Sequence, residues 1–284
     1  MDLLFCSDIH GEDAHFARLV TVAAQARPDV IILGGDMLPD DSALDRKKMG
    51  HGQPAYVRET FRNHITSLRD SSGCREILTI FGNHDWGSSV TAMKQLESDG
   101  LVRILDLDHP YCVGGVSFLG YSCTPPTPWY VKDFERLDVP GDAPPLLGGA
   151  RWDARFSRPS QQSSGFLFNS VKTMQEELST LKPPAPPWVF VAHAPPYMSK
   201  LDRYYGDQSW GSKAVRAAIE KHQPMLSLHG HIHESPEVSG SCQDTIGATI
   251  AVNPGQSRSI LLYATIKLDA KVGKVLEVNQ GRAS

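Results

Sequence analysis

Five short blocks of aspartate, asparagine and histidine side chains are the parts of this sequence best suited to chemistry. The blocks contain Asp8 and His10, then Asp36, then Asn83 and His84, then His193, and finally His231 and His233. Carboxylates, imidazoles and amide oxygens together suit borderline divalent ions such as Mn, Fe and Zn. No block contains a cysteine, which argues against a structural zinc site. Seven of these side chains are good ligands for two divalent ions.

The block at residues 81–85 shows how the chain presents such groups. Residues 76–81 are apolar and rich in β-branched side chains, which predicts a strand, and Gly82 then turns the chain. Asn83 can offer a carbonyl oxygen to a metal, and His84 can offer a proton. Taken alone, this segment is equally well explained as an ordinary Gly-Asn turn. The four other blocks favour the functional interpretation.

Every block follows a segment that is predicted to be a buried strand. These strands are expected at residues 3–6, 29–33, 76–81, 188–192 and 225–229, and helices at residues 13–26, 54–68, 90–99, 166–181 and 212–221. Alternating strands and helices predict a βαβ sheet. Because open α/β sheets bind ligands outside the carboxyl ends of their strands, we expect the blocks to meet at one edge.

The remaining segments are less regular. Short strands are predicted at residues 101–105, 110–113 and 116–119, with a hairpin turn at 114–115, and antiparallel strands at 249–252, 259–268 and 274–278. Residues 40–53 are interpreted as a loop, and residues 123–165 as an irregular Pro- and Gly-rich insertion. The aromatic side chains of this insertion favour a lid or wall beside the site over a floppy surface segment. No clear linker appears, so residues 1–284 are expected to form a single domain.

Composition excludes several classes of protein. The chain of 284 residues is 40% apolar and 21% charged, so it can form a sizeable core. Its formal charge of −4 and its lack of a basic tract argue against an extended nucleic-acid surface or a membrane-surface protein. There is no signal-peptide pattern, no apolar run of transmembrane length and no paired-cysteine motif. A reduced, cytoplasmic setting is the expectation.

In their order and spacing, the five blocks resemble the calcineurin-like metallophosphoesterase superfamily, over most of the chain. The resemblance implies a four-layer α/β/β/α sandwich, in which two mixed sheets are flanked by helices. It also implies two metal ions, with Mn expected first and Fe or Zn as alternatives. The first ion would be held by Asp8, His10, Asp36 and His233. Asp36 would bridge to the second ion, which Asn83, His193 and His231 would complete.

A narrower resemblance is to the small phosphodiesterases of the metallophosphoesterase-domain-containing type. It rests on residues 126–129, 206–207, 211, 224 and 230–234. The sequence departs from the protein-phosphatase branch after Asp36, where an aspartate is expected three residues later. Position 39 is proline and Asp40 comes one residue late, which leaves the partner of His84 open.

The resemblance implies hydrolysis of phosphoesters, with phosphodiesters slightly preferred over monoesters. Two cations about 3.5–4 Å apart can clamp the attacking and leaving oxygens and lower the pKa of bound water to about 7. A metal-bridging hydroxide is therefore the expected nucleophile. His84 is not needed as a ligand and is the expected general acid. The expected substrate is a small phosphoester, for example a nucleotide, contacted by Asn83, His84 and Trp129.

Two alternatives stay open. The first is a phosphomonoesterase, including a protein phosphatase. The second is a binding or scaffold protein that carries a vestigial metal site, although the intact set of ligands argues against it. Metal content and turnover of a nitrophenyl diester would separate these classes. The sequence does not indicate the oligomeric state.

Overall fold

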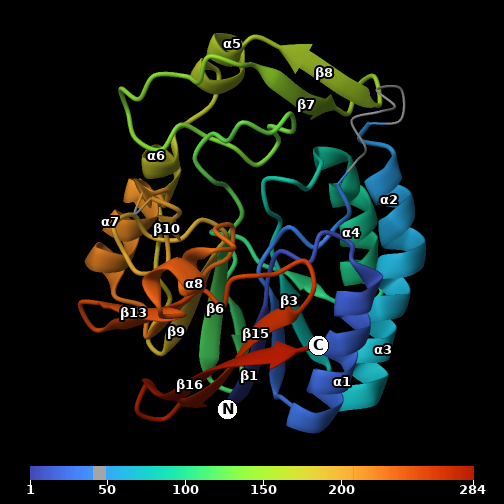
Figure 1. The fold of residues 1–284 in the computed structure, drawn as a ribbon, viewed down its shortest axis with the longest axis vertical. Coiled ribbons are helices and arrows are strands. Elements are labelled where there is room, and N and C mark those ends of the chain that lie inside the picture. Colours follow the sequence, from blue (N-terminus) through green and yellow to red (C-terminus); the bar gives the residue numbers. More distant parts are fainter. Residues whose placement is uncertain (41–48, 207) are drawn as a thin grey trace.

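The computed structural model describes residues 1–40, 49–206 and 208–284. Two six-stranded mixed sheets lie between two sets of helices (Figure 1). The first sheet has the strand order β16-β15-β1-β2-β3-β4. Strands β1 to β4 are parallel to one another, and β15 is antiparallel to both of its neighbours, β1 and β16. Its strands are β1 (Asp2–Cys6), β2 (Val30–Leu33), β3 (Glu76–Thr79), β4 (Arg103–Ile104), β15 (Leu261–Asp269) and β16 (Lys274–Ala283).

The second sheet has the order β13-β14-β12-β9-β6-β5, with four parallel central strands and an antiparallel strand at each edge. Its strands are β5 (Tyr111–Val113), β6 (Val116–Tyr121), β9 (Trp188–Ala192), β12 (Leu226–Leu228), β13 (Gln243–Ile246) and β14 (Thr249–Val252). Two hairpins stand apart, β7 (Gly149–Asp153) with β8 (Arg158–Gln162), and β10 (Arg203–Tyr204) with β11 (Gln208–Ser209).

Helices cover the outer faces of both sheets. The first sheet is covered by α1 (Asp13–Ala26), α3 (Arg62–Ser72) and α4 (Val90–Ser98), and the second by α6 (Met174–Ser179) and α7 (Lys213–His222). The other helical segments are α2 (Gly52–Tyr56), the π-helical turn Val57–Phe61, the 3-10 turn Gly87–Ser89, α5 (Ser164–Asn169) and α8 (Ser235–Ser239).

Alternating side chains on the strands build three apolar cores. On β1, Leu4 and Cys6 pack among residues of the helices, whereas Leu3 and Phe5 pack between the two sheets. A third core joins the outer face of the second sheet to α6 and α7. Successive strand residues point to opposite faces, so a strand with helices on one side and a sheet on the other is apolar throughout. The predicted four-layer sandwich is therefore confirmed.

The helix predicted at 166–181 is wrong, because the chain forms two short helices there. The first helix ends at Asn169, and Thr173 caps the start of α6. Its hydroxyl accepts the backbone N–H of Glu176 at 3.2 Å, and the Glu176 carboxylate accepts the backbone N–H of Thr173 at 2.7 Å. This capping box corresponds to a Thr-x-x-Glu pattern in the sequence, which indicates the start of a helix. Here it decides the helix boundary against the apolar periodicity of residues 166–181.

Other boundaries also shift. The helix expected at 54–68 is part of a longer helical run from Gly52 to Ser72. Within the expected loop at 40–53, residues 41–48 lie outside the described residues, as does Asp207 of the narrower motif. The region expected to be irregular at 123–165 contains the β7–β8 hairpin. Strand β14 pairs in parallel with β12 and is antiparallel only to β13, whereas β15 and β16 are antiparallel as predicted.

Candidate metal centre

Five strand ends from the two sheets deliver the predicted ligands to one place. The ligand-bearing turns follow β1, β2 and β3 of the first sheet and β9 and β12 of the second. Backbone hydrogen bonds join neighbouring turns. The Asp8 N–H donates to the Gly35 carbonyl at 3.0 Å, and the Gly230 N–H donates to the His193 carbonyl at 3.0 Å. The turns are thus extensions of the sheets rather than free loops.

Four of the predicted ligands have left-handed backbone conformations. The φ angles of Asp8, His10, Asp36 and His231 are 59°, 51°, 52° and 67°. A positive φ is uncommon for residues other than glycine, and each costs on the order of 1–3 kcal/mol. Such strain persists only where surrounding contacts enforce it, and it is typical of functional sites.

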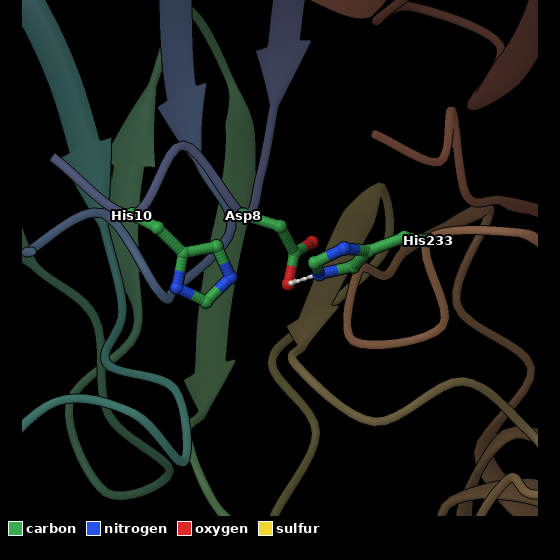
Figure 2. Close-up of side chains that lie close together, drawn as sticks. All are labelled: Asp8, His10 and His233. Carbon is green, nitrogen blue, oxygen red and sulfur yellow. Dashed lines mark ion pairs between the residues drawn. The ribbon is translucent and has the colours of Figure 1, made fainter. Parts of the chain in front are cut away.

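Asp8, His10 and His233 form the first group of candidate ligand atoms, all within 4.8 Å of one another. Figure 2 shows the Asp8 carboxylate between the two imidazole rings, with an ion pair to His233 at 3.2 Å between Oδ1 and Nε2. Burial alone would raise the pKa of Asp8, but His233 and His193 outweigh it and hold the pKa below its usual range. The carboxylate is therefore ionised, as a metal ligand must be.

Asp8, Asp36 and His193 form a second group of the same kind, and all three are buried. His193 Nε2 lies 3.1 Å from Asp36 Oδ2 and 3.8 Å from Asp8 Oδ1. Its other ring nitrogen, Nδ1, lies 2.8 Å from the Gly34 carbonyl oxygen. Burial lowers the pKa of His193, but Asp36 and Asp8 outweigh burial and raise it to about 9. A carbonyl oxygen can only accept, so Nδ1 carries a proton and Nε2 faces the carboxylates. This is the orientation that a metal-ligating histidine requires.

Asn83 supplies a direct test of whether a metal fits. Its side chain is fully buried, and neither Oδ1 nor Nδ2 has a hydrogen-bond partner among the residues that the structure describes. A buried amide without partners costs about 1–3 kcal/mol, so such groups call for an explanation. A divalent ion on Oδ1 would provide that explanation.

His231 is the remaining candidate ligand. Desolvation lowers its pKa to about 3, which keeps the imidazole neutral and able to ligate.

Two motif glycines are needed because the chain passes close to these ligands. A Cβ atom at Gly82 would lie 2.3 Å from Asp36 Oδ1 and 2.6 Å from His193 Nε2. A Cβ atom at Gly230 would lie 2.3 Å from Asp8 Oδ2. Any side chain at either position would displace a candidate ligand, so glycine is required there for steric reasons.

His84 lies beside the ligand groups and has a carboxylate partner. Its Nδ1 atom is 2.6 Å from Asp40 Oδ1, and its backbone N–H donates to Asp36 Oδ1 at 2.8 Å. Burial lowers the pKa of His84, but Asp36 and Asp40 more than compensate and raise it to about 9. Its ring meets that of Trp129 edge to face, with 4.6 Å between centroids.

Sequence reasoning missed Gln53, which ties the Asp40 segment to the His84 turn. Its buried amide donates to the carbonyls of Pro39 at 3.0 Å and His84 at 2.9 Å, and it accepts the Trp86 N–H at 2.7 Å. A lone glutamine in a polar stretch gives no signal of this role. Asp40 itself was visible as an acid one residue late, and its side chain reaches His84 despite Pro39.

A cavity of about 1190 Å³ opens over these groups. Its lining includes the candidate ligands Asp8, His10, Asp36, His231 and His233, as well as His84. Thr127, Pro128 and Trp129, from the region predicted to border the site, also line it. The volume exceeds the roughly 300–1,000 Å³ of common ligand pockets, so the cavity has room for more than a phosphate group.

The buried ion pair between Lys132 and Glu135 positions this lining loop. Their side chains are 1% and 0% exposed, with 2.8 Å between Nζ and Oε2. Lys132 Nζ donates to the Thr127 carbonyl at 2.7 Å, and the Thr127 N–H donates to Glu135 Oε2 at 3.0 Å. The Trp129 N–H in turn donates to the Thr127 hydroxyl at 3.3 Å. The pair therefore sets where the Trp129 ring meets His84.

Lys132→Met should strand a buried carboxylate and lower the free energy of unfolding by about 3–5 kcal/mol, measured in urea. The double variant Lys132→Met/Glu135→Leu should regain most of this loss, because no uncompensated charge remains. The fluorescence emission of Trp129 is obtained by subtracting the spectrum of the same chain carrying Trp129→Phe. This emission should differ from that of the wild-type protein in the single variant and in the double variant. The exposed Lys182→Met serves as control. Wild-type unfolding and emission in Lys132→Met would contradict the assignment.

Residues 1–235 match the family model described as calcineurin-like phosphoesterase. This chain belongs to that family. The fold and the candidate ligand groups of this chain agree with that membership. Among the helices that the structure describes, none is long and apolar enough to cross a bilayer.

Individual relatives are distant. A UPF0046 protein of Caenorhabditis elegans is 32% identical over 78 residues, a match that spans 26% of this chain and 26% of the relative. A crystal structure of a Thermus thermophilus protein aligns over 99% of this chain and 97% of its own, with a TM-score of 0.55 and 16% identity. Another crystal structure aligns over 100% of this chain and 99% of its own, with a TM-score of 0.63 and 17% identity. These structural similarities support the fold.

Proposed function

We propose that this phosphoesterase hydrolyses phosphodiesters of small molecules with two divalent ions, Mn foremost, bound in the cavity. The proposed ligands are Asp8, His10, Asp36, Asn83, His193, His231 and His233. The observation that carries the proposal is the pair of ligand groups sharing the Asp8 carboxylate, next to the unpartnered amide of Asn83. We also propose that residues 1–284 act as one catalytic domain.

The charge and orientation of two buried carboxylates support this proposal. When bound, two divalent ions would supply positive charge to the phosphoryl oxygens and make an attacking water more acidic. Asp8 and Asp36 have lowered pKa values, so both carboxylates stay ionised at neutral pH. Asp36 presents Oδ2 towards His193 and Oδ1 towards the His84 N–H, which suits a carboxylate placed between two ions.

His84 is proposed to protonate the leaving oxygen. Its Nδ1 atom is engaged by Asp40, and its ring lines the cavity, so Nε2 is the nitrogen left to donate a proton to substrate. Both neighbouring carboxylates favour the protonated imidazole. A protonated histidine beside the reacting group is what a basic leaving alkoxide requires.

Metal analysis tests the proposal directly. After loading with Mn and removal of free ions, elemental analysis should find two ions per chain, because seven ligands are proposed and the buried Asn83 side chain has no hydrogen-bond partner among the described residues. His193→Ala should reduce the content to one ion or less, since it removes a buried ligand. The exposed His109→Ala, whose ring pairs with Asp106, serves as control and should keep both ions. Fewer than one ion in the wild-type chain would refute the proposal.

Turnover separates the remaining functional classes. Mn-loaded protein should hydrolyse bis(p-nitrophenyl) phosphate faster than p-nitrophenyl phosphate. The reverse ranking would favour the phosphomonoesterase alternative. Bound metal without turnover of either ester would favour a binding or scaffold protein. The preference for diesters is supported by the resemblance of residues 230–234 to small phosphodiesterases.

A further inference from the structure

Three exposed aromatic side chains gather beside the metal centre. Tyr204, Tyr205 and Trp210 are 38%, 55% and 49% exposed, and all three line the same cavity as the candidate metal ligands. The Tyr204 ring centroid lies 5.4 Å from that of Tyr205 and 5.5 Å from that of Trp210. Tyr204 belongs to β10, a strand labelled in Figure 1, Tyr205 follows it, and Trp210 follows β11. The three rings form one continuous surface, here called the aromatic wall.

The aromatic wall has a fixed position because Asp202 organises the loop that carries it. The Asp202 side chain is fully buried, and its carboxylate accepts backbone N–H groups of Met198 at 2.9 Å, Ser199 at 3.0 Å and Gly211 at 3.1 Å. The Trp210 N–H donates to the Asp202 carbonyl at 3.0 Å. One carboxylate therefore holds the segments before and after the hairpin together by hydrogen bonds. The exposed rings thus have a fixed position.

The wall is also tied to the metal centre. The buried Asn253 amide donates to the carbonyls of Leu201, Gly230 and Ile232, each at 3.1 Å. Leu201 lies at the base of the hairpin, whereas Gly230 and Ile232 flank the candidate ligand His231. This fixes the separation between the wall and the metal centre.

The wall has the chemistry of a stacking surface for a flat ring. Exposed tyrosine and tryptophan rings bind planar groups by stacking. Glu234 and Glu237 line the same cavity, and Glu237 raises the pKa of Tyr205, so carboxylate acceptors lie near the rings. These charges disfavour an acyl chain. Centroids 5.4 and 5.5 Å apart leave no space between the rings to enclose an ammonium group.

We propose that the aromatic wall is a subsite for a planar, nitrogen-bearing ring on the alcohol that the phosphodiester retains, as in a nucleoside. The subsite rests on the proposed function for its chemistry, since the phosphate would react at the metal centre while the ring reaches the wall. Tyr204 and Trp210 are tilted by 52° to each other, so a flat ring would stack on the face of one and contact the edge of the other. The carboxylates of Glu234 and Glu237 would accept hydrogen bonds from ring N–H groups.

Esters with one common leaving group test this subsite. Methyl, phenyl, choline and thymidine-5′ esters of p-nitrophenyl phosphate all release nitrophenolate, so differences in kcat/KM report the retained alcohol. In Mn-loaded wild-type protein, the thymidine and phenyl esters should exceed the methyl ester by about tenfold or more. Trp210→Ala and Tyr204→Ala should each reduce this ratio by about tenfold, and Tyr204→Phe should preserve it.

Phe166→Ala is the matched control, because Phe166 is 62% exposed and is not among the residues that line the cavity. It should keep the wild-type ratio. An unchanged ratio in Trp210→Ala would overturn the proposal. A choline ester that exceeds the phenyl and thymidine esters would also overturn it and would point to recognition of a cation. Far-ultraviolet circular dichroism should confirm that each variant is folded.

Binding separates this proposal from the proposed function. If no ester is turned over, the catalytic proposal fails, but calorimetric titration with thymidine 5′-phosphate still tests the wall. Wild-type protein should bind this nucleotide about tenfold more tightly than Trp210→Ala. Equal affinities in the two proteins would overturn the subsite whatever the outcome of the turnover assay.

Discussion

Asp36→Asn is expected to lower kcat/KM for a phosphodiester by about 10³-fold or more, because a metal centre contributes several kcal/mol to transition-state stabilisation. The substitution preserves shape and removes charge from a buried carboxylate that lies 3.1 Å from His193 and accepts the His84 N–H. The weakened site should hold at most one ion after Mn loading. Kinetics and elemental analysis on the same preparation measure both effects.

The exposed Asp108→Asn provides the control for this change, since Asp108 lies outside the metal centre. It should keep both ions and wild-type kinetics. The Asp36→Asn chain should remain folded, because asparagine can still accept the His84 N–H. Full activity with two bound ions in Asp36→Asn would show that this carboxylate does not hold the metals.

His84→Ala is expected to retain both metal ions yet lose activity in a manner that depends on the leaving group. An alkoxide needs a proton as it departs, whereas nitrophenolate hardly does. The loss in kcat should therefore be about 10²–10⁴-fold for an alkyl or ribose leaving group and much smaller for nitrophenolate. Measuring kcat and KM for both kinds of ester in one variant compares them under identical metal loading.

Asp40→Asn sharpens the assignment of His84, since it leaves the imidazole in place and removes the charge 2.6 Å from Nδ1. It should show the same dependence on leaving group with a smaller loss. Equal losses of His84→Ala on both esters would mean that His84 only positions phosphate by charge. Loss of metal in His84→Ala would instead make it a ligand.

The placement of the candidate ligands at strand ends could be predicted, because each block directly follows an apolar strand. The partner of His84 could not, because Pro39 displaces Asp40 by one residue and only the folded chain shows that its side chain still reaches 2.6 Å. Charged residues three apart normally indicate solvated surface, so the burial of Lys132 and Glu135 was equally hidden. The single helix predicted at 166–181 is wrong because Thr173 caps a separate helix, so that local capping outweighs the apolar periodicity.

The candidate ligands come from both sheets, and this division has a consequence for how the chain matures. Asp8, His10, Asp36 and Asn83 follow strands of the first sheet, whereas His193, His231 and His233 follow strands of the second. A growing chain therefore cannot complete the centre until about 230 residues have been made and the two sheets have docked. Ions that bind only the docked state would fasten one sheet to the other, contributing about 2.7 kcal/mol at a free metal concentration 100 times Kd. Metal binding would thus be the last step that stabilises the docked arrangement of the two sheets.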